Sequence, residues 1–162
     1  MPQPGHRVFG TTTVRVSKVI HAPLRYVYEW STDYRPDDWR LRRKGAARSK
    51  IRVLRASPRR VIRIRLRPNR SADPDITVDV VRLHPPADWH TDQIDEADRM
   101  AIDYHLVRLG PRKTRLELYV TERWITPEYP TPRELRQQVL GPWDRLAAAL
   151  ETRYRSGAPA RG

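Results

Sequence analysis

The feature that most constrains the fold of this chain is a long amphipathic segment near its end. Between Pro132 and Tyr154, apolar residues recur at helical spacing, which predicts a helix of about six turns; they are Leu135, Val139, Leu146, Leu150 and Tyr154. Strand-like segments fill most of the chain before it. A large sheet and one amphipathic helix bury their apolar faces best when the sheet curls around the helix.

Seven segments alternate apolar and polar residues with the period of a β-strand, and turn-forming residues separate most of them. They cover residues 11–20, 50–56, 60–66, 76–83, 88–94, 99–108 and 114–125. Short helical segments are expected at 23–32 and 36–41, directly after the first strand. The sequence therefore predicts an α+β fold, in which a curved seven-stranded antiparallel sheet wraps around a long C-terminal helix and two short helices follow strand 1.

Composition limits the chain to a single domain of ordinary size. We expect this domain to cover residues 11–155, with flexible ends at 1–10 and 156–162, which are rich in Gly, Pro and Arg. The absence of cysteine excludes disulfides and thiolate chemistry. No apolar run reaches the length of a membrane span, and the N-terminus lacks a signal-peptide pattern, so a cytoplasmic protein is expected.

Two stretches resemble a known superfamily. The first is Val-Ile-His-Ala-Pro-Leu-Arg-Tyr-Val-Tyr at 19–28, followed by Thr32-Asp33 and Trp39, and the second is the turn into a Thr-Arg-Leu strand at 110–118. Together with the order of the elements, they resemble the helix-grip fold of the START-like and polyketide cyclase (SRPBCC) superfamily. The resemblance implies a cavity between sheet and helix that holds a hydrophobic small molecule, such as a lipid, an isoprenoid or a polyketide-like compound. A cofactor-independent cyclase or dehydratase is the alternative.

The lining of such a cavity follows from strand alternation, with a fully packed core as the other interpretation. The inward parity is assigned to Ile62, Ile64 and Leu66 in the third strand, so Arg63 and Arg65 are expected outside. The ligand-binding candidates are Tyr28, Trp39, Ile64, Leu66, Ile102, Tyr104, Leu118, Val120, Glu122, Trp124, Val139 and Trp143.

Glu122 and Arg67 are the candidate catalytic residues. Glu122 falls at an apolar parity position, where a carboxylate must be paired, lie at the cavity mouth or have a shifted pKa; the alternative is a strand-end residue paired with arginine or water. Arg67-Pro68-Asn69 is similar to a stretch of aromatase/cyclases that contains a pocket arginine, although parity places Arg67 on the outer face with Arg63 and Arg65.

His90 and Asp92 share a face two residues apart, which suits acid–base chemistry, weak metal binding or a solvated acidic hairpin. The hairpin is the simplest of the three interpretations, and its acidic residues are Asp88, Asp92, Asp95, Glu96 and Asp98. No metal or cofactor motif occurs in the sequence, so neither is expected.

The basic segment 35–70 raises a different class of function. It carries 15 Lys or Arg and 2 Asp, so it accounts for the whole net charge of +13. Such a patch suits phosphate contacts, but Trp39 is its only aromatic residue and no recognition motif occurs, so nucleic acid is an unlikely partner. Transient contact with an anionic membrane surface is the other option. The sequence does not indicate an oligomeric state.

Overall fold

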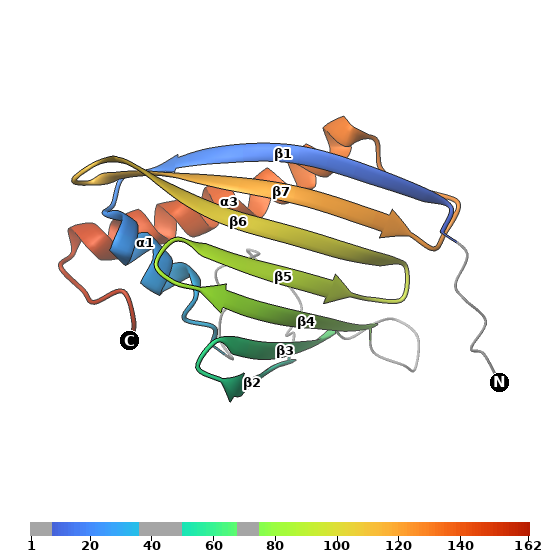
Figure 1. The fold of residues 1–162 in the computed structure, drawn as a ribbon, viewed down its shortest axis with the longest axis horizontal. Helices are drawn as coiled ribbons and strands as arrows, with labels where there is room; N and C mark the ends of the chain where they lie inside the picture. The colour runs from blue at the N-terminus through green and yellow to red at the C-terminus, as the bar shows by residue number, and fades with distance from the viewer. Residues whose placement is uncertain (1–7, 36–49, 68–74) are drawn as a thin grey trace.

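The computed structural model describes residues 8–35, 50–67 and 75–162 (Figure 1). Its elements are β1 (Gly10–Ile20), α1 (Leu24–Ser31), β2 (Lys50–Ser57), β3 (Arg60–Arg67), β4 (Asp75–His84), β5 (Asp88–Ile94), β6 (Asp98–Gly110), β7 (Lys113–Trp124) and α3 (Pro132–Arg155). The predicted second short helix, at 36–41, lies outside the described residues, in which a single short helix follows β1.

All seven strands form one antiparallel sheet in the order β1-β7-β6-β5-β4-β3-β2. Strands β2 to β7 follow one another as hairpins, and the first strand pairs with the last. Helix α3 lies behind this sheet in Figure 1. The predicted helix-grip architecture is confirmed.

Helix α3 begins where local sequence favours it. The Thr131 hydroxyl accepts a hydrogen bond from the Glu134 amide while the Glu134 carboxylate accepts one from the Thr131 amide, so two free N–H groups are satisfied. Pro132 is well placed in the first turn. The buried side chains form one stripe toward the sheet: Leu135, Val139, Trp143, Ala147 and Leu150.

The inner face of the sheet, which faces α3, is identified by cross-strand rows of buried side chains. One row contains Val14, Val120 and Ile102, and the next contains Val16, Leu118, Tyr104, Trp89 and Leu83. These rows and the α3 stripe make up most of the hydrophobic core. The inward parity predicted for β6 and β7 is therefore confirmed.

The parity predicted for β3 is wrong. Val61 is fully buried and Arg63 is 3% exposed, whereas Ile62, Ile64 and Leu66 are only half-buried and lie on the outer face. The reason is the neighbouring strand, because Arg63 pairs in register with Asp79, whose carboxylate neutralises it inside the protein. Arg67 has the same parity as Arg63, which removes the parity argument against it; its side chain is outside the description.

The end of the chain returns to α1. The Tyr26 hydroxyl donates a hydrogen bond of 2.9 Å to the Ala158 carbonyl, and Ala160 is buried. These contacts fall in the 156–162 segment that composition marks as flexible.

Among the helices that the structure describes, none is long and apolar enough to cross a membrane.

Candidate functional site

Four aromatic rings form a continuous chain between the sheet and the two helices. Tyr28 of α1 meets the edge of Trp89 at 5.9 Å, Trp89 stacks on Tyr104 at 4.6 Å, and Tyr104 lies 6.1 Å from Trp143 of α3. Offset stacked and edge contacts of this kind stabilise aromatic clusters beyond their area burial. The four rings form a rigid apolar wall on the inner face, which we call the aromatic wall.

Part of the inner face keeps access to solvent next to this wall. Gln93, Met100, Tyr104 and Trp124 all have inward parity, yet each is only half-buried. Leu140 of α3 is also half-buried against the core. Because these side chains are on the face that α3 covers, their residual exposure shows that α3 leaves this part of the face partly uncovered.

A polar row crosses the sheet in this part of the inner face. Strand pairing aligns Glu122, Met100, Gln93, Asp79 and Arg63, on β7, β6, β5, β4 and β3 in turn. Adjacent strands lie about 4.8 Å apart, so the row extends roughly 20 Å across the inner face. A hydrophobic core does not normally place an amide, an ion pair and a carboxyl in one line.

An ion-pair cluster forms one end of the row. Arg63 donates to Asp79 through Nε at 2.7 Å and lies 2.6 Å from it through Nη2, while Arg65 Nη2 approaches the other carboxylate oxygen at 3.4 Å. The Arg63 guanidinium also lies 5.1 Å from the centre of the Tyr34 ring, a cation–π distance. Asp79 is fully buried, so its charge depends on these arginines.

A carboxyl pair forms the other end. Glu122 is 1% exposed and contacts the carboxyl of Asp98, which is 6% exposed. Burial, with hydrogen bonding and repulsion from Asp98, raises the pKa of Glu122 to about 9, and burial also raises the pKa of Asp98. At neutral pH, Glu122 therefore keeps its proton, and its carboxyl group donates a hydrogen bond to Asp98.

Several buried polar atoms near this pair have no hydrogen-bond partner among the described residues. They are Glu122 Oε2, Asp98 Oδ1, Trp124 Nε1 and, at the aromatic wall, Tyr28 Oη. Trp124 and Asp98 are direct cross-strand neighbours, so the first three atoms belong to one corner of the inner face. Unsatisfied buried groups are costly, and a bound molecule with donors and acceptors would satisfy them.

The structure brings most of the predicted ligand-binding residues together. Seven of them lie in or against the core between sheet and helices: Tyr28, Ile102, Tyr104, Leu118, Val120, Val139 and Trp143. Glu122 and Trp124 lie on the same face of β7 as Leu118 and Val120. Ile64 and Leu66 do not lie in this core, because they are on the outer face. Trp39 lies outside the described residues.

Sequence reasoning missed Asp79, Asp98 and Trp89. Asp79 interrupts the apolar residues of β4 just as Glu122 interrupts those of β7, so the same signal was present. Asp98 was assigned to a solvated acidic hairpin, an interpretation that is wrong at this residue because it is buried beside Glu122. No sequence signal distinguished it from Asp95 and Glu96.

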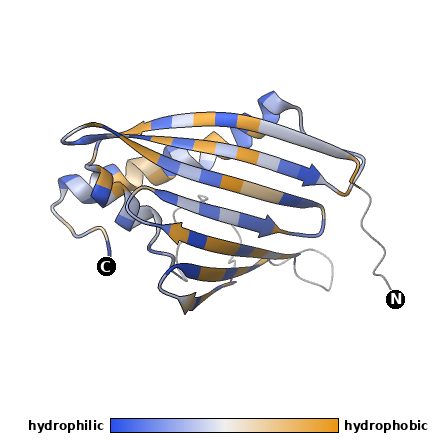
Figure 2. Ribbon diagram, in the orientation of Figure 1, coloured by the Kyte–Doolittle hydropathy of each residue, from blue (hydrophilic) through white to orange (hydrophobic). Residues whose placement is uncertain are grey.

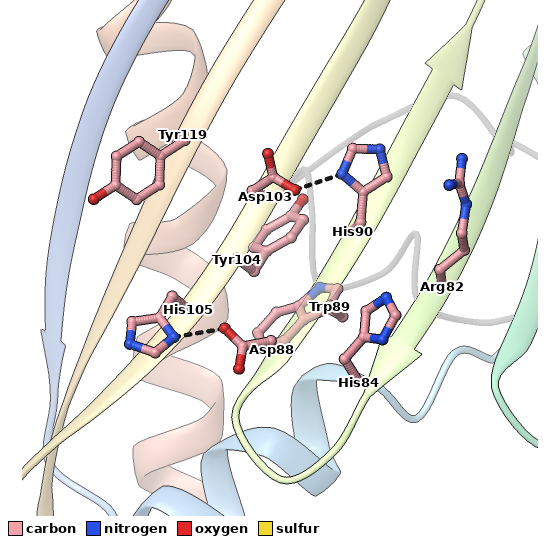
Figure 3. A pocket seen from close by; sticks show the side chains of 9 residues that line it. All are labelled: Arg82, His84, Asp88, Trp89, His90, Asp103, Tyr104, His105 and Tyr119. Atoms are coloured by element: carbon pink, nitrogen blue, oxygen red, sulfur yellow. Dashed lines mark hydrogen bonds and ion pairs between the residues drawn. The ribbon is translucent and has the colours of Figure 1, made fainter.

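The outer face carries a hollow of about 450 Å³, with His and Asp side chains from β4, β5 and β6 around it; Trp89 and Tyr104 of the aromatic wall also line it (Figure 3). His90 lies 2.6 Å from Asp103 through Nδ1 and 2.9 Å from Asp92 through Nε2. Partial burial favours neutral imidazole, but these hydrogen bonds raise the pKa of His90 above its ordinary value. With both nitrogens occupied, His90 is a poor general base. Within the described ranges, no three His, Cys, Asp or Glu side chains are grouped to hold a metal ion.

Comparison with known proteins supports the fold through structure and not through sequence. No protein-family model matches the chain, and no curated protein sequence does. The crystal structure of the Zhui aromatase/cyclase from Streptomyces sp. R1128 matches with a TM-score of 0.65 at 14% identity, over 93% of this chain and 99% of that one. Ara h 8.0201 matches with a TM-score of 0.66 at 12% identity, over 91% and 99% of the two chains.

A START superfamily protein from Mycobacterium smegmatis also matches, with a TM-score of 0.60 at 15% identity over 91% of this chain and 99% of that one. Each of these matches spans more than 90% of both chains, so the three structures share the fold of this chain. The fold of this chain is thus the helix-grip fold of START-like proteins. At such low identity the likeness establishes the fold and leaves the activity to the site itself.

Proposed function

We propose that this protein binds a hydrophobic small molecule on the inner face of the sheet, beside α3. The observation that carries the proposal is the corner where half-buried Met100 pairs in register with Glu122, beside the unpartnered polar atoms of Glu122, Asp98 and Trp124. Small-molecule sites combine an apolar lining with a few polar groups in this way. The helix-grip folds of the aromatase/cyclase and START structures support the same class of function.

Binding of Nile red, a neutral apolar dye, tests this proposal. Met100→Trp adds bulk at this corner of the inner face, so we expect dye affinity to fall by about tenfold or more, an effect of ~1.4 kcal/mol. Ala101→Trp is the matched control, because Ala101 is the next residue on β6 and faces the other side of the sheet. If both variants are folded and bind the dye like wild type, the inner face is not the site. Native mass spectrometry of gently purified protein would then identify any ligand retained elsewhere.

A cyclase or dehydratase activity is the second candidate, and the Glu122–Asp98 pair favours it. A pair that shares one proton offers an acid and a base side by side. In the dehydration of a β-hydroxy ketone, Asp98 would remove the proton next to the carbonyl and Glu122 would protonate the leaving hydroxyl, which departs as water. Glu122→Gln keeps the shape of the side chain and removes the proton donor.

For an enzyme of this kind, Glu122→Gln should lower turnover of a β-hydroxy ketone by ~100-fold or more while affinity for it is retained. For a carrier, wild type and variant bind equally well and neither converts the compound. Product formation by wild type, followed by chromatography, distinguishes the two.

A further inference from the structure

The outer face of the sheet bears an apolar area where β2, β3 and β4 lie at its edge. Figure 2 shows hydrophobic positions alternating with hydrophilic ones along β3 and β4. We name this area the outer aliphatic patch and define it by Leu54, Ile62, Ile64, Leu66, Ile76 and Ile94. Cross-strand pairing makes it continuous, since Leu54 adjoins Ile62, Leu66 adjoins Ile76, and Val78 lies between Ile64 and Ile94.

The side chains of the outer aliphatic patch are more exposed than the packing of the fold requires. Leu54 is 54% exposed, Ile76 is 46% and Ile94 is 38%, while the three β3 residues are half-buried. Single exposed aliphatic residues are common, but a contiguous group on one face is typical of a binding surface. On β3 the apolar residues are outside while Arg63 is inside, so the exposure is built into the strand.

Basic side chains border the outer aliphatic patch. Lys50 and Arg52 lie in its cross-strand rows on the edge strand β2, and Arg60 and Arg82 form the next row on the same face. All four are exposed. On that face Asp92 is bound to Arg82 and His90, so the positive charge of the border rests on Lys50, Arg52 and Arg60. The acidic residues Asp95 and Glu96 follow Ile94 at the opposite corner.

We propose that the outer aliphatic patch docks on an anionic phospholipid surface. Aliphatic tips enter the boundary between head groups and acyl chains, and the surrounding Lys and Arg meet lipid phosphates with their ammonium and guanidinium groups. The backbone of β3 and β4 is paired on both sides, so these two strands bring no unpaired strand edge into the interface.

The border charges and the residue types exclude the other occupants. A second copy would bring two basic borders together, and like charges oppose such an interface. Single-stranded nucleic acid would meet no aromatic side chain for base stacking within the patch. The docking is independent of the inner-face site, and it would hold a carrier at a surface where hydrophobic ligands are found.

Flotation with vesicles tests the proposal. Wild type should bind vesicles of phosphatidylcholine with about 30% phosphatidylglycerol, and lose most of this binding to pure phosphatidylcholine. Lys50→Gln with Arg52→Gln removes two charges and should weaken the partition about 30-fold, at ~1 kcal/mol per charge. Leu54→Thr with Ile76→Thr should weaken it by about tenfold. Val19→Thr with Leu109→Thr, at exposed positions elsewhere, is the matched control and should bind like wild type.

Each alternative has its own outcome. The proposal is overturned if the charge variant and the aliphatic variant bind vesicles as well as wild type does. All three proteins must have the same thermal midpoint for this comparison. A wild-type dimer in light scattering that the aliphatic variant abolishes would show that the patch is a self-interface. Loss of duplex DNA binding in the charge variant, without any vesicle binding by wild type, would assign the surface to nucleic acid.

Discussion

Arg63 and Asp79 form an ion pair inside the protein: Nη2 of the arginine lies 2.6 Å from Oδ2 of the aspartate, and their side chains are 4% and 0% exposed. A buried ion pair adds little net stability compared with an apolar pair, but removal of one partner leaves an uncompensated charge. The pair occupies one end of the polar row that reaches Glu122 across the inner face. It therefore links the stability of the β3–β4 hairpin to the site.

Arg63→Leu should lower the free energy of unfolding by about 3 kcal/mol, because Asp79 loses its two short contacts and keeps the 3.4 Å contact with Arg65. Arg52→Leu, on the exposed face of the neighbouring strand, is the control and should change it by less than about 0.5 kcal/mol. Urea denaturation measures both. A similar small loss in the two variants would mean that water reaches Asp79.

The β3–β4 hairpin also shows what the sequence alone could and could not predict. The seven strands and α3 follow from the spacing of their apolar residues, a pattern that lies within each segment. Strand alternation also gave the correct inward residues for β6 and β7, since their apolar residues share a parity. In β3 the apolar parity is Ile62, Ile64 and Leu66, and it faces outward.

Local pattern could not settle the orientation of β3, because the decisive partner of Arg63 is on another strand. The same limit applies to Asp98, which acquires its role only when β6 pairs with β7 and places it beside Glu122. Glu122 was found because its own strand is otherwise apolar at that parity. A charged residue at an apolar strand position was thus the most informative signal in the sequence. Asp79 in β4 is another residue of this kind.

The free energy of unfolding should fall as pH rises, and part of this fall should come from Glu122. In the unfolded chain its carboxyl ionises above an ordinary pKa of 4.5, while in the folded protein it keeps its proton up to about 9. The unfolded state therefore binds fewer protons between these values, and the linkage relation makes folding progressively less favourable there. Unfolding by urea at pH 5, 7 and 9 should show this decline in wild type and a weaker one in Glu122→Gln.

Glu128→Gln, at an exposed loop position, is the control for the pH series and should follow wild type. The measured quantity is the difference in slope between each variant and wild type, since other groups, such as His90, also titrate in this range. Parallel curves for Glu122→Gln and wild type would show that Glu122 is ionised in the folded protein at neutral pH.

Gly141 offers a stabilising change in the middle of α3. A Cβ at this position would meet nothing within 4 Å, so Gly141→Ala fills no occupied space. Alanine loses less backbone entropy than glycine in a helix, so unfolding should cost about 0.5–1 kcal/mol more, with a rise of roughly 2–4 °C in Tm. Ala148→Gly, exposed on the same helix, should give the opposite shift. A lower Tm for Gly141→Ala would show that Gly141 is required beside Pro142.

The aromatic wall provides the sharpest test of where the ligand lies. Tyr104 stacks on Trp89 and faces Trp143, whereas Tyr119 on the adjacent strand β7 is 42% exposed on the outer face. Tyr104→Arg places a charged, hydrated group in the half-open interior, so Nile red affinity should fall by about tenfold or more, and loss of stacking should also cost about 0.5–1.5 kcal/mol of stability. Tyr119→Arg makes the same chemical change on the other face and should leave dye binding intact. A folded Tyr104→Arg protein that binds Nile red like wild type would place the ligand away from the aromatic wall, and the inner-face site would have to be given up.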